Sequence, residues 1–376
     1  MLASGSRAFA QRSAVKVLFF ISSLQCGGAE RVSVMLCNGF AQRGWDVTLA
    51  TFDDGSVPPF FPVAPGVRHV TLGLHRRSTG VVHSVVNNVR RVPRLSRFVA
   101  DERPDRIVSF IDGTNVLALL ASRGTGIPVI VSERIDPAQH RIPVPWRILR
   151  RLTYRWASAI VVQTRAAAAY FPKSWQSRIA VVPNPVGKAS SRADMDAAVP
   201  QRIVAMGRLE RQKGFDLLVR AFARIAPEHP GWTLTILGEG SERASLEREI
   251  AASGVADRIA LPGREADVAG VLRRSGLFVL SSRYEGFPNA LCEAMALGLP
   301  VVSFDCPSGP AEIIRDGVDG LLVPAEDVDA LASTISRLIA DPGRMRELSR
   351  RAVEISDRFS EERIDALWRS ILERGT

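Results

Sequence analysis

The chain has 376 residues, of which 46% are hydrophobic, so it is long enough and apolar enough to bury the cores of two domains. No apolar run approaches the roughly 20 residues that a membrane-spanning helix needs. Residues 1–13 lack the apolar centre of a signal peptide and are predicted to form a flexible tail. The cysteines show no C-x-x-C spacing, which argues against a zinc or disulfide framework and indicates reduced thiols in a cytoplasmic protein. They are Cys26, Cys37, Cys292 and Cys306.

The net charge of +10 is unevenly distributed along the chain. Residues 1–190 hold 25 Lys and Arg against 10 Asp and Glu, a net charge of +15, whereas the remaining residues have a net charge of −5. Such asymmetry indicates an N-terminal half that faces an anionic partner, either nucleic acid or an acidic membrane surface.

Short apolar runs predict buried parallel strands in the first half of the chain. They cover residues 15–22, 46–52, 105–111, 128–133 and 159–164. A helical pattern over 29–44 separates the first two strands, and this strand–helix–strand order is a βαβ unit. Residues 14–187 are therefore predicted to form a Rossmann-like domain.

The second half repeats the alternation of strands and helices. Strand-like runs cover residues 202–209, 233–238, 259–263, 277–282 and 300–305. Helical patterns at 215–226 and 290–298 lie between them, which predicts a second Rossmann-like domain over 201–358.

Two further segments complete the predicted organisation. Residues 182–200 are rich in Pro, Ala and Ser and lack periodicity, and we place a linker at 188–200. Residues 359–376 are predicted to form an amphipathic helix, with Ser360 as its N-cap and acids in its first turn. In doubly wound domains ligands bind beyond the carboxyl ends of the strands, so the loops there are the places to look for a site.

The first such loop is GRLERQKG, residues 207–214, between a predicted strand and a predicted helix. A loop that opens a helix offers free N–H groups and the positive end of the helix dipole to an anion. Arg208 adds a fork of donors and Lys213 a mobile point charge, so together they could hold a diphosphate. The alternative is a solvated basic loop, which the position after the first strand of a domain disfavours.

The second loop is YEGFPNALCE, residues 284–293, in which Glu285 and Glu293 lie eight positions apart. A helix is predicted to begin near Pro288 or Asn289, which places the two carboxylates on different elements. Carboxylates that accept from vicinal hydroxyls can bind a sugar ring or a ribose. The alternative is a pair of solvated surface acids, but the apolar sequence around Glu293 predicts a partly buried helix.

These motifs resemble those of the retaining glycosyltransferases of family 4. The resemblance is carried by GRLERQKG, LGEGSERASLE, LPGREADV, SRYEGFPNALCEAMALGLPVV and IIRDGVDGLLVP, in this order over residues 200–325, and more loosely by VLFFISSLQCGGAERV in the first half. It implies the GT-B fold, in which two doubly wound Rossmann-like domains face each other across a cleft and a C-terminal helix crosses back. The sub-pattern is similar to that of bacterial enzymes that build exopolysaccharide or lipid-linked oligosaccharides.

The resemblance implies a role for each matching residue. Arg208 and Lys213 would neutralise the diphosphate of the donor, Glu293 would bind the ribose hydroxyls, and Glu285 would lie near the hydroxyls of the donor sugar. Arg208, Lys213 and Glu285 are thus the catalytic candidates. Further donor contacts are expected from backbone-exposing loops, with Gly263 and Arg264 at the nucleobase. These contacts are Gly27, Gly28, Gly207, Gly263, Arg264, Gly286, Phe287, Pro288 and Asn289.

One region departs from the family pattern. Many members carry a histidine after the fourth strand of the N-terminal domain, where this chain has Asp112, Thr114 and Asn115 instead. We expect one of these polar residues to contact the sugar. Glu133 and Arg134 follow another strand and are expected to line the acceptor side. The histidines stand elsewhere and are predicted to be surface or loop residues; they are His69, His75, His83, His140 and His229.

The mechanism implied by the resemblance needs no metal and no cofactor. Arg208 and Lys213 would stabilise the charge that develops on a nucleotide diphosphate leaving group, with UDP-sugars favoured as donors. Retention would follow from front-face attack, in which the donor phosphate takes the proton of the acceptor. That route needs no protein nucleophile, unlike the two-carboxylate scheme of glycosidases.

Residues 141–156 mix arginines with apolar and aromatic residues. Arg147, Arg150, Arg151 and Arg155 are predicted to share a helical face, which is typical of an interfacial helix on anionic lipid but also of a solvated helix. Residues 90–98 form a second basic segment. A lipid-linked acceptor would explain a basic acceptor domain and predicts a cytoplasmic protein, peripheral at the inner face of the cytoplasmic membrane.

Other classes of protein fit the sequence less well. A dinucleotide-dependent dehydrogenase would need G-x-G-x-x-G after its first strand, and a nucleic-acid binder would show an RNP, KH or zinc pattern; the chain has neither. Two alternatives stay open, a related GT-B enzyme with a soluble acceptor and a non-catalytic subunit that binds a nucleotide sugar.

Overall fold

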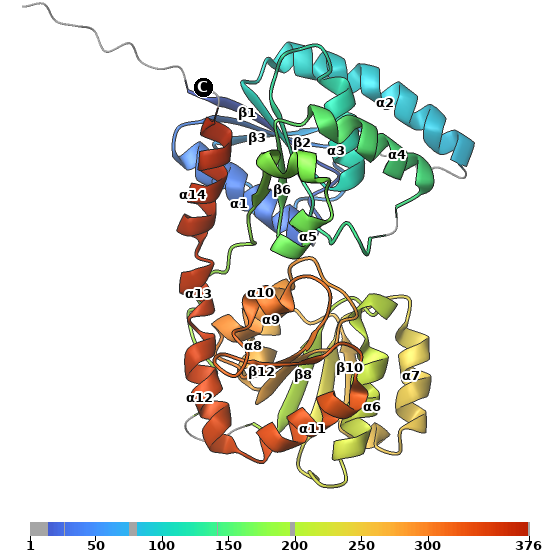
Figure 1. Ribbon diagram of the computed structural model, residues 1–376, viewed down its shortest axis with the longest axis vertical. Helices are drawn as coiled ribbons and strands as arrows, with labels where there is room; N and C mark the ends of the chain where they lie inside the picture. The colour runs from blue at the N-terminus through green and yellow to red at the C-terminus, as the bar shows by residue number, and fades with distance from the viewer. Residues whose placement is uncertain (1–13, 26, 75–80, 141, 196–199, 375–376) are drawn as a thin grey trace, which may run out of the picture. The chain divides into compact units, whose positions relative to one another are not determined.

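The computed structural model describes residues 14–25, 27–74, 81–140, 142–195 and 200–374, with the side chains of 81–90 left out (Figure 1). The predicted tail, Cys26, His75, Arg141 and residues 196–199 of the predicted linker lie outside the described residues. The contacts divide the chain into two compact units. The first holds residues up to 132 together with 143–160, and the second holds 133–142 and 161 onward.

The first sheet has seven strands within the described residues, in the order β3-β2-β1-β4-β5-β6-β7. Their bounds are β1 (Lys16–Ile21), β2 (Asp46–Thr51), β3 (Val67–Thr71), β4 (Arg106–Phe110), β5 (Val129–Ser132), β6 (Ala159–Val162) and β7 (Ile179–Val181). The pairings β1–β2, β1–β4, β2–β3 and β4–β5 are parallel. The chain therefore reverses its direction of travel across the sheet between β1 and β4.

Helices cover both faces of this sheet, because β1 is apolar at every position except its first. Phe19 stacks on Phe40 of α1 at 6.2 Å, while its neighbour Phe20 points to the opposite face and contacts Phe98 of α2 at 6.3 Å. The helices of this half are α1 (Gly28–Gln42), α2 (Val81–Glu102), α3 (Asp112–Ala121), α4 (Val144–Thr153) and α5 (Arg165–Ala169), with short 3-10 turns η1 (Tyr154–Trp156) and η2 (Lys173–Arg178).

The second sheet has six strands in the described part of the chain, in the order β10-β9-β8-β11-β12-β13. They are β8 (Arg202–Met206), β9 (Thr233–Leu237), β10 (Ile259–Gly263), β11 (Leu277–Leu280), β12 (Val301–Asp305) and β13 (Leu321–Pro324). All of its pairings are parallel. Here the direction of travel reverses between β8 and β11.

Alternate residues of these strands enter two separate cores, which is the side-chain period of a strand. Ile203 and Ala205 of β8 pack with the helices on one face, whereas Val204 between them packs with the helices on the other. The elements of this half, among them α6 and α11 side by side in Figure 1, are α6 (Phe215–Ile225), α7 (Arg243–Ala252), α8 (Val268–Arg273), α9 (Asn289–Ala296), α10 (Pro310–Ile313), α11 (Val328–Ile339), α12 (Pro342–Ala352), α13 (Ile355–Arg358) and α14 (Glu361–Glu373), with η3 (Arg211–Lys213) and η4 (Ala256–Arg258).

The prediction of two Rossmann-like domains with parallel sheets is confirmed. Ser360 is the N-cap of α14, as predicted, since its side chain accepts from the backbone N–H of Arg363. Residues 193 and 195 of the predicted linker pack on the second unit. The backbone N–H of Ala193 donates to Leu297 O at 2.8 Å, and Met195 is buried. None of the helices in the described ranges combines the length and apolar character needed to cross a bilayer.

Candidate functional site

The candidate site of the second unit lies at the point where its strand order reverses. The loop that follows β8 carries Arg208 and Lys213, and the loop that follows β11 carries Glu285. Because β8 and β11 are parallel neighbours, their carboxyl ends meet at the same edge of the sheet. In an open α/β sheet the crevice outside such a reversal is where ligands bind.

Hydrogen bonds join these two loops along their length. The backbone N–H of Arg283 donates to Gln212 O at 2.8 Å, and the Gln212 side chain donates to Tyr284 O at 3.0 Å. One residue further on, the hydroxyl of Ser281 donates to Lys213 O at 3.0 Å. These hydrogen bonds therefore join the two loops into one structure.

Gly214 makes this close approach possible. It lies in the left-handed region at φ +61°, where a residue with a side chain is strained. A Cβ atom at this position would lie 2.1 Å from the carbonyl oxygen of Ser281. Glycine is thus needed both for the turn that ends η3 and for the contact between the loops.

An ion pair behind the loops ties the β11 loop to α6. Arg283 donates to both carboxylate oxygens of Asp216, at 2.8 and 2.7 Å. Burial opposes the charge on Asp216, but the hydrogen bonds and the charge of Arg283, together with Arg220, outweigh it and hold its pKa below the ordinary value. The same guanidinium contacts Glu326 at 3.0 Å.

Lys213 and Glu285 form a largely buried ion pair. The ammonium lies 2.6 Å from Glu285 Oε1, with side chains 15% and 6% exposed. The hydroxyl of Ser282 donates to the same oxygen at 2.6 Å. The two candidate residues are therefore brought together, and the carboxylate of Glu285 balances the charge of Lys213.

Arg208 differs from Lys213 because its side chain is exposed. Among the residues that the structure describes, its guanidinium has no side-chain partner. It therefore supplies a cation that is available to a ligand at the carboxyl end of β8.

Glycines end three neighbouring strands beside Arg208. Gly207 follows β8, Gly238 follows β9, and Gly263 ends β10. Backbone hydrogen bonds link these strand ends, since Gly207 N–H donates to Leu237 O and Gly238 N–H donates to Gly263 O. At Gly238, with φ +138°, a Cβ atom would lie 1.9 Å from Gly207 O. This edge of the sheet thus presents bare backbone to which a ligand can approach closely.

Arg264 is exposed next to this row of glycines. Below it, Arg243 makes a two-pronged ion pair with Glu239, at 2.8 and 2.7 Å, and this pairing together with the nearby charge of Arg264 holds the pKa of Glu239 below its ordinary value. The buried Gly263 and the exposed Arg264 therefore border a charged rim at the end of β10.

The acidic motif places Glu293 on a helix, as predicted. α9 begins at Asn289 with Pro288 as its N-cap, and Glu293 is half-buried in its second turn. Phe287 is buried and packs edge-on against Phe359 at 5.6 Å. Glu285 and Glu293 thus stand on a loop and on a helix, respectively.

The start of α9 is held by amide side chains. Asn184 donates to Asn289 Oδ1 at 2.7 Å and accepts from Gln163 at 2.8 Å. Gly286 is packed closely, because a Cβ atom there would lie 3.0 Å from both Gln163 Oε1 and Arg134 O. Arg134 therefore lies with its backbone against the predicted donor loop.

The candidate residues of the first unit also lie where the strand order reverses. Gly28 begins α1 after β1, and Asp112, Thr114 and Asn115 begin α3 after β4. The residue before α3, Ile111, has φ +73°, which is strained for a β-branched side chain.

These polar residues differ in how far they are exposed to solvent. Asn115 is fully buried and donates to Ser132 O at 3.1 Å and to Tyr154 Oη at 2.9 Å. Thr114 is also buried, whereas Asp112 is half-buried. Of these three candidate residues, Asp112 is the most accessible. Glu133 is buried after β5.

Gly27 is the N-cap of α1, and its surroundings are acidic. A Cβ atom on it would lie 2.2 Å from a carboxylate oxygen of Glu30, whose side chain folds back over the start of the helix. The turn at Gly27 and Gly28 is therefore bordered by a carboxylate at the start of α1.

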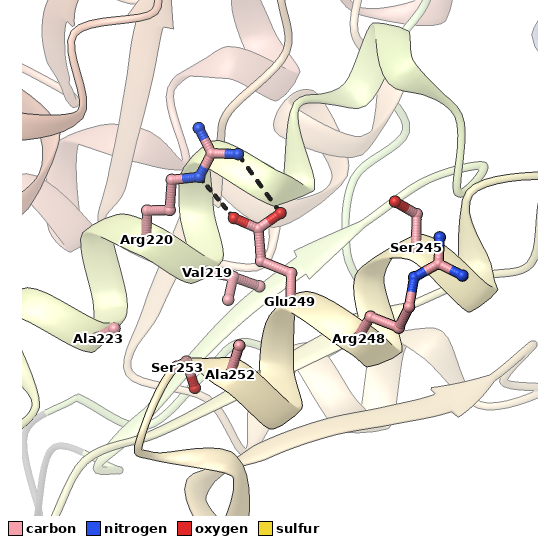
Figure 2. Close-up of a pocket in the computed structure, with 8 residues that line it drawn as sticks. All are labelled: Val219, Arg220, Ala223, Ser245, Arg248, Glu249, Ala252 and Ser253. Carbon is pink, nitrogen blue, oxygen red and sulfur yellow. Dashed lines mark hydrogen bonds and ion pairs between the residues drawn. The ribbon is translucent and has the colours of Figure 1, made fainter.

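A hollow of about 450 Å³ lies elsewhere in the second unit, between α6 and α7. Figure 2 shows Arg220 of α6 reaching Glu249 of α7, with Arg248 and Ser245 further along α7. None of its lining residues belongs to the loops at the carboxyl ends of the strands. The hollow is thus separate from the candidate site.

Two parallel sheets of this kind, with polar loops gathered where each strand order reverses, define a protein of the GT-B fold. The chain belongs to the glycosyltransferases. Residues 200–341 match the family of glycosyl transferases group 1, and residues 27–185 match the glycosyl transferase 4-like domain.

Known proteins of this family resemble the chain along most of its length. A Campylobacter jejuni N-acetylgalactosaminyltransferase that acts on an undecaprenol-linked saccharide is 26% identical, over 95% of this chain and 98% of that protein. An exopolysaccharide phosphotransferase of Streptomyces coelicolor is 33% identical over 74% of this chain, which spans only 27% of that protein. The structure of Anabaena Alr3699/HepE in complex with UDP has the same fold, with a TM-score of 0.77, 21% identity and coverage of 95% and 99%.

Proposed function

We propose that this glycosyltransferase moves a hexosyl unit from a UDP-sugar to a lipid-linked or growing polysaccharide acceptor, with retention of configuration. The observation that carries the proposal is the cluster of Arg208, Lys213 and Glu285 at the reversal between β8 and β11. The UDP bound to the Anabaena protein and the undecaprenol-linked acceptor of the Campylobacter protein support the choice of donor and acceptor.

In the donor half, each group has a distinct task. The exposed guanidinium of Arg208 binds the diphosphate, and its charge stabilises the leaving group. Lys213 contacts Glu285 and would also contact that diphosphate, so its ammonium can donate hydrogen bonds to both. Glu285 accepts from hydroxyls of the sugar, and Glu293 from those of the ribose.

The chemistry proposed here needs neither a metal nor a protein nucleophile. The acceptor hydroxyl attacks the anomeric carbon on the face that the diphosphate leaves, and a phosphate oxygen takes the hydroxyl proton. The cations Arg208 and Lys213 balance the charge that a divalent ion balances in other transferases. Transfer that persists in excess EDTA would support this part of the proposal, and transfer that EDTA abolishes and Mg²⁺ restores would contradict it.

A surface of α4 supports contact with an anionic membrane. Val144, Ile148 and Leu152 are 55%, 54% and 47% exposed, and they form a stripe at a spacing of four residues. Arg147 and Arg151 of α4, and Arg155 of the turn η1 that follows it, are also exposed. We call these six residues the α4 face, and a mixture of apolar and basic side chains is what an interfacial helix presents to anionic lipid.

The prediction that Arg150 shares this face is wrong. Arg150 is 4% exposed and lies on the buried side of α4 with Thr153. In the basic segment of α2, Arg94 and Arg97 are exposed, while Arg91 donates to Leu74 O at 2.8 Å. We propose that the enzyme is cytoplasmic and that the α4 face holds it at the inner face of the membrane, where a lipid-linked acceptor lies.

The donor proposal is tested by thermal-shift screening against UDP- and GDP-sugars. We expect a UDP-sugar to raise the Tm of the wild type, and Arg208→Ala and Glu293→Ala each to weaken its binding about tenfold or more. Arg248→Ala, which removes an exposed arginine of α7, is the matched control and should bind as the wild type does. A wild type that binds no nucleotide sugar would overturn the proposal.

The acceptor proposal needs a second assay, in which a UDP-sugar that binds is incubated with a polyprenyl-linked saccharide. Transfer to the lipid-linked saccharide is the expected result. Transfer only to a soluble saccharide would indicate a soluble acceptor, and binding with neither transfer nor hydrolysis would indicate a non-catalytic subunit.

A further inference from the structure

Two protein donors converge on a single oxygen of Glu285. The hydroxyl of Ser282 and the ammonium of Lys213 both donate to Oε1, each at 2.6 Å. Within the residues that the structure describes, no hydrogen bond reaches the other oxygen, Oε2. The carboxylate thus has one oxygen held by protein and one left for a ligand.

The hydroxyl of Ser282 and the ammonium of Lys213 do not constrain the carboxylate equally. Lysine has a long, flexible side chain. Because Lys213 would also contact the proposed diphosphate, its contact with Glu285 can change when a nucleotide sugar binds. Ser282 is 1% exposed and has a single rotatable bond before its hydroxyl. It lies three residues before Glu285 in the loop that the neighbouring Ser281 and Arg283 tie to the β8 loop. The more rigid constraint on Glu285 therefore comes from Ser282.

We propose that Ser282 is a positioning residue for recognition of the donor sugar. By occupying Oε1, it fixes the plane of the Glu285 carboxylate and reserves Oε2 for a hydroxyl of the hexosyl unit. The inference rests on the proposed function, in which Glu285 binds the sugar. It assigns Ser282 to the sugar alone, since the uracil, ribose and diphosphate make no use of Oε2.

Calorimetric titration with UDP and with four UDP-sugars separates these contributions. The sugars are glucose, galactose, N-acetylglucosamine and N-acetylgalactosamine. We expect Ser282→Ala to weaken the best-bound UDP-sugar about tenfold, the effect of losing one hydrogen bond to a charged group, and to leave the affinity for UDP unchanged. Ser275→Ala is the matched control, because Ser275 is also fully buried but its hydroxyl donates to the backbone of Val271. It should change neither affinity.

A double-mutant cycle with Glu285→Gln decides whether Ser282 acts through Glu285. If it does, Ser282→Ala has little further effect on UDP-sugar binding once the carboxylate has become an amide. An effect that persists undiminished in the Glu285→Gln background, or one that is equal for UDP and the UDP-sugar, would show a merely structural role and overturn the inference.

A Ser282→Ala protein that binds both ligands as the wild type does would also overturn the inference, while leaving the proposed function in place. A wild type that binds UDP but none of the four UDP-sugars would instead remove the proposed function on which the inference stands. The two failures are therefore distinguished by the wild type alone.

Discussion

Gly214 is the residue on which the contact between the β8 loop and the β11 loop depends most directly. Its left-handed backbone, and the 2.1 Å that would separate an added Cβ atom from Ser281 O, leave no room for a side chain. Relief would require the β8 loop to move away from the β11 loop. That movement would separate Lys213 from Ser281 and Glu285, so stability and activity should fall together.

We predict that Gly214→Ala lowers the free energy of unfolding by about 3 kcal/mol or more and abolishes transfer, because backbone strain and a clash add. Gly254→Ala is the control, since Gly254 has φ +76° but no atom within 4 Å of an added Cβ. It should cost about 1 kcal/mol and retain activity. Urea denaturation measures both, and equal losses in the two variants would refute the role of the Ser281 contact.

Cys306 is a buried thiol close to the donor cluster. Burial, and then the negative charge of Glu285, raise its pKa to about 12, so the thiol stays protonated at neutral and moderately alkaline pH. We predict that iodoacetamide at pH 8 leaves Cys306 unmodified in the folded protein and modifies it in guanidinium chloride. Peptide mass spectrometry measures the modification. Labelling of the folded protein at the rate of a small thiol would contradict this prediction.

At the scale of residues, the sequence indicated the charged members of the candidate site but not every residue that contacts them. Arg208, Lys213 and Glu285 stand out because charged residues in loops after apolar strands are conspicuous. Ser282 does not, since a serine at the end of a strand is common and only its 2.6 Å contact with Glu285 singles it out. Asn115 looked available for a sugar, yet its amide is used within the core.

At the scale of elements, the pair of Asp216 and Arg283 links α6 to the β11 loop, and its contribution depends on pH. The folded-state pKa of Asp216 lies below the ordinary value of about 3.9. A lowered pKa means that the carboxylate stabilises the folded state above the unfolded pKa, and that this stability is lost as the pH falls through the folded pKa. The loss therefore begins near pH 4 and grows below it.

We predict that Asp216→Asn lowers the free energy of unfolding at pH 7 by about 1 to 3 kcal/mol and reduces its decline below about pH 5. Asp329→Asn is the matched control, because Asp329 pairs with Arg224 while 87% exposed, and such surface pairs contribute little. Denaturation curves between pH 7 and pH 3 measure both variants. The prediction is wrong if the two respond alike.

The strands that the sequence did not predict share a position in the sheets. β3, β7 and β13 each lie at the edge of a sheet and are only partly buried. An edge strand packs on fewer neighbours, so its sequence need not be a continuous apolar run. The central strands are buried on both faces, and their apolar runs were therefore visible without a structure.

At the scale of the whole molecule, the two halves share a type of fold but differ in charge. The net charge of +15 over residues 1–190 contrasts with −5 over the rest, in which the donor motifs lie. Composition alone left nucleic acid and membrane as possible partners. The exposed arginines of α4 alternate with exposed aliphatic side chains, and we propose a membrane as the partner because binding to phosphates alone would need no apolar stripe.

We predict that the enzyme binds vesicles containing phosphatidylglycerol and that the α4 face is responsible. Replacing Arg147 and Arg151 by Glu should weaken binding about tenfold or more, since each basic residue near an anionic surface contributes about 1 kcal/mol. Replacing Ile148 and Leu152 by Ser should weaken it by a similar factor through lost apolar contact. Co-sedimentation at rising salt measures both effects.

The charge control is Arg192→Glu with Arg248→Glu, which changes the net charge equally at two exposed sites of the second unit. If net charge alone drove binding, this control would weaken it as much as the α4 variant does. Binding that rises with phosphatidylglycerol, falls with salt and is lost only in the α4 variants requires both charge and apolar contact at one surface. Equal binding to purely zwitterionic vesicles would show that anionic lipid is not the partner of the α4 face.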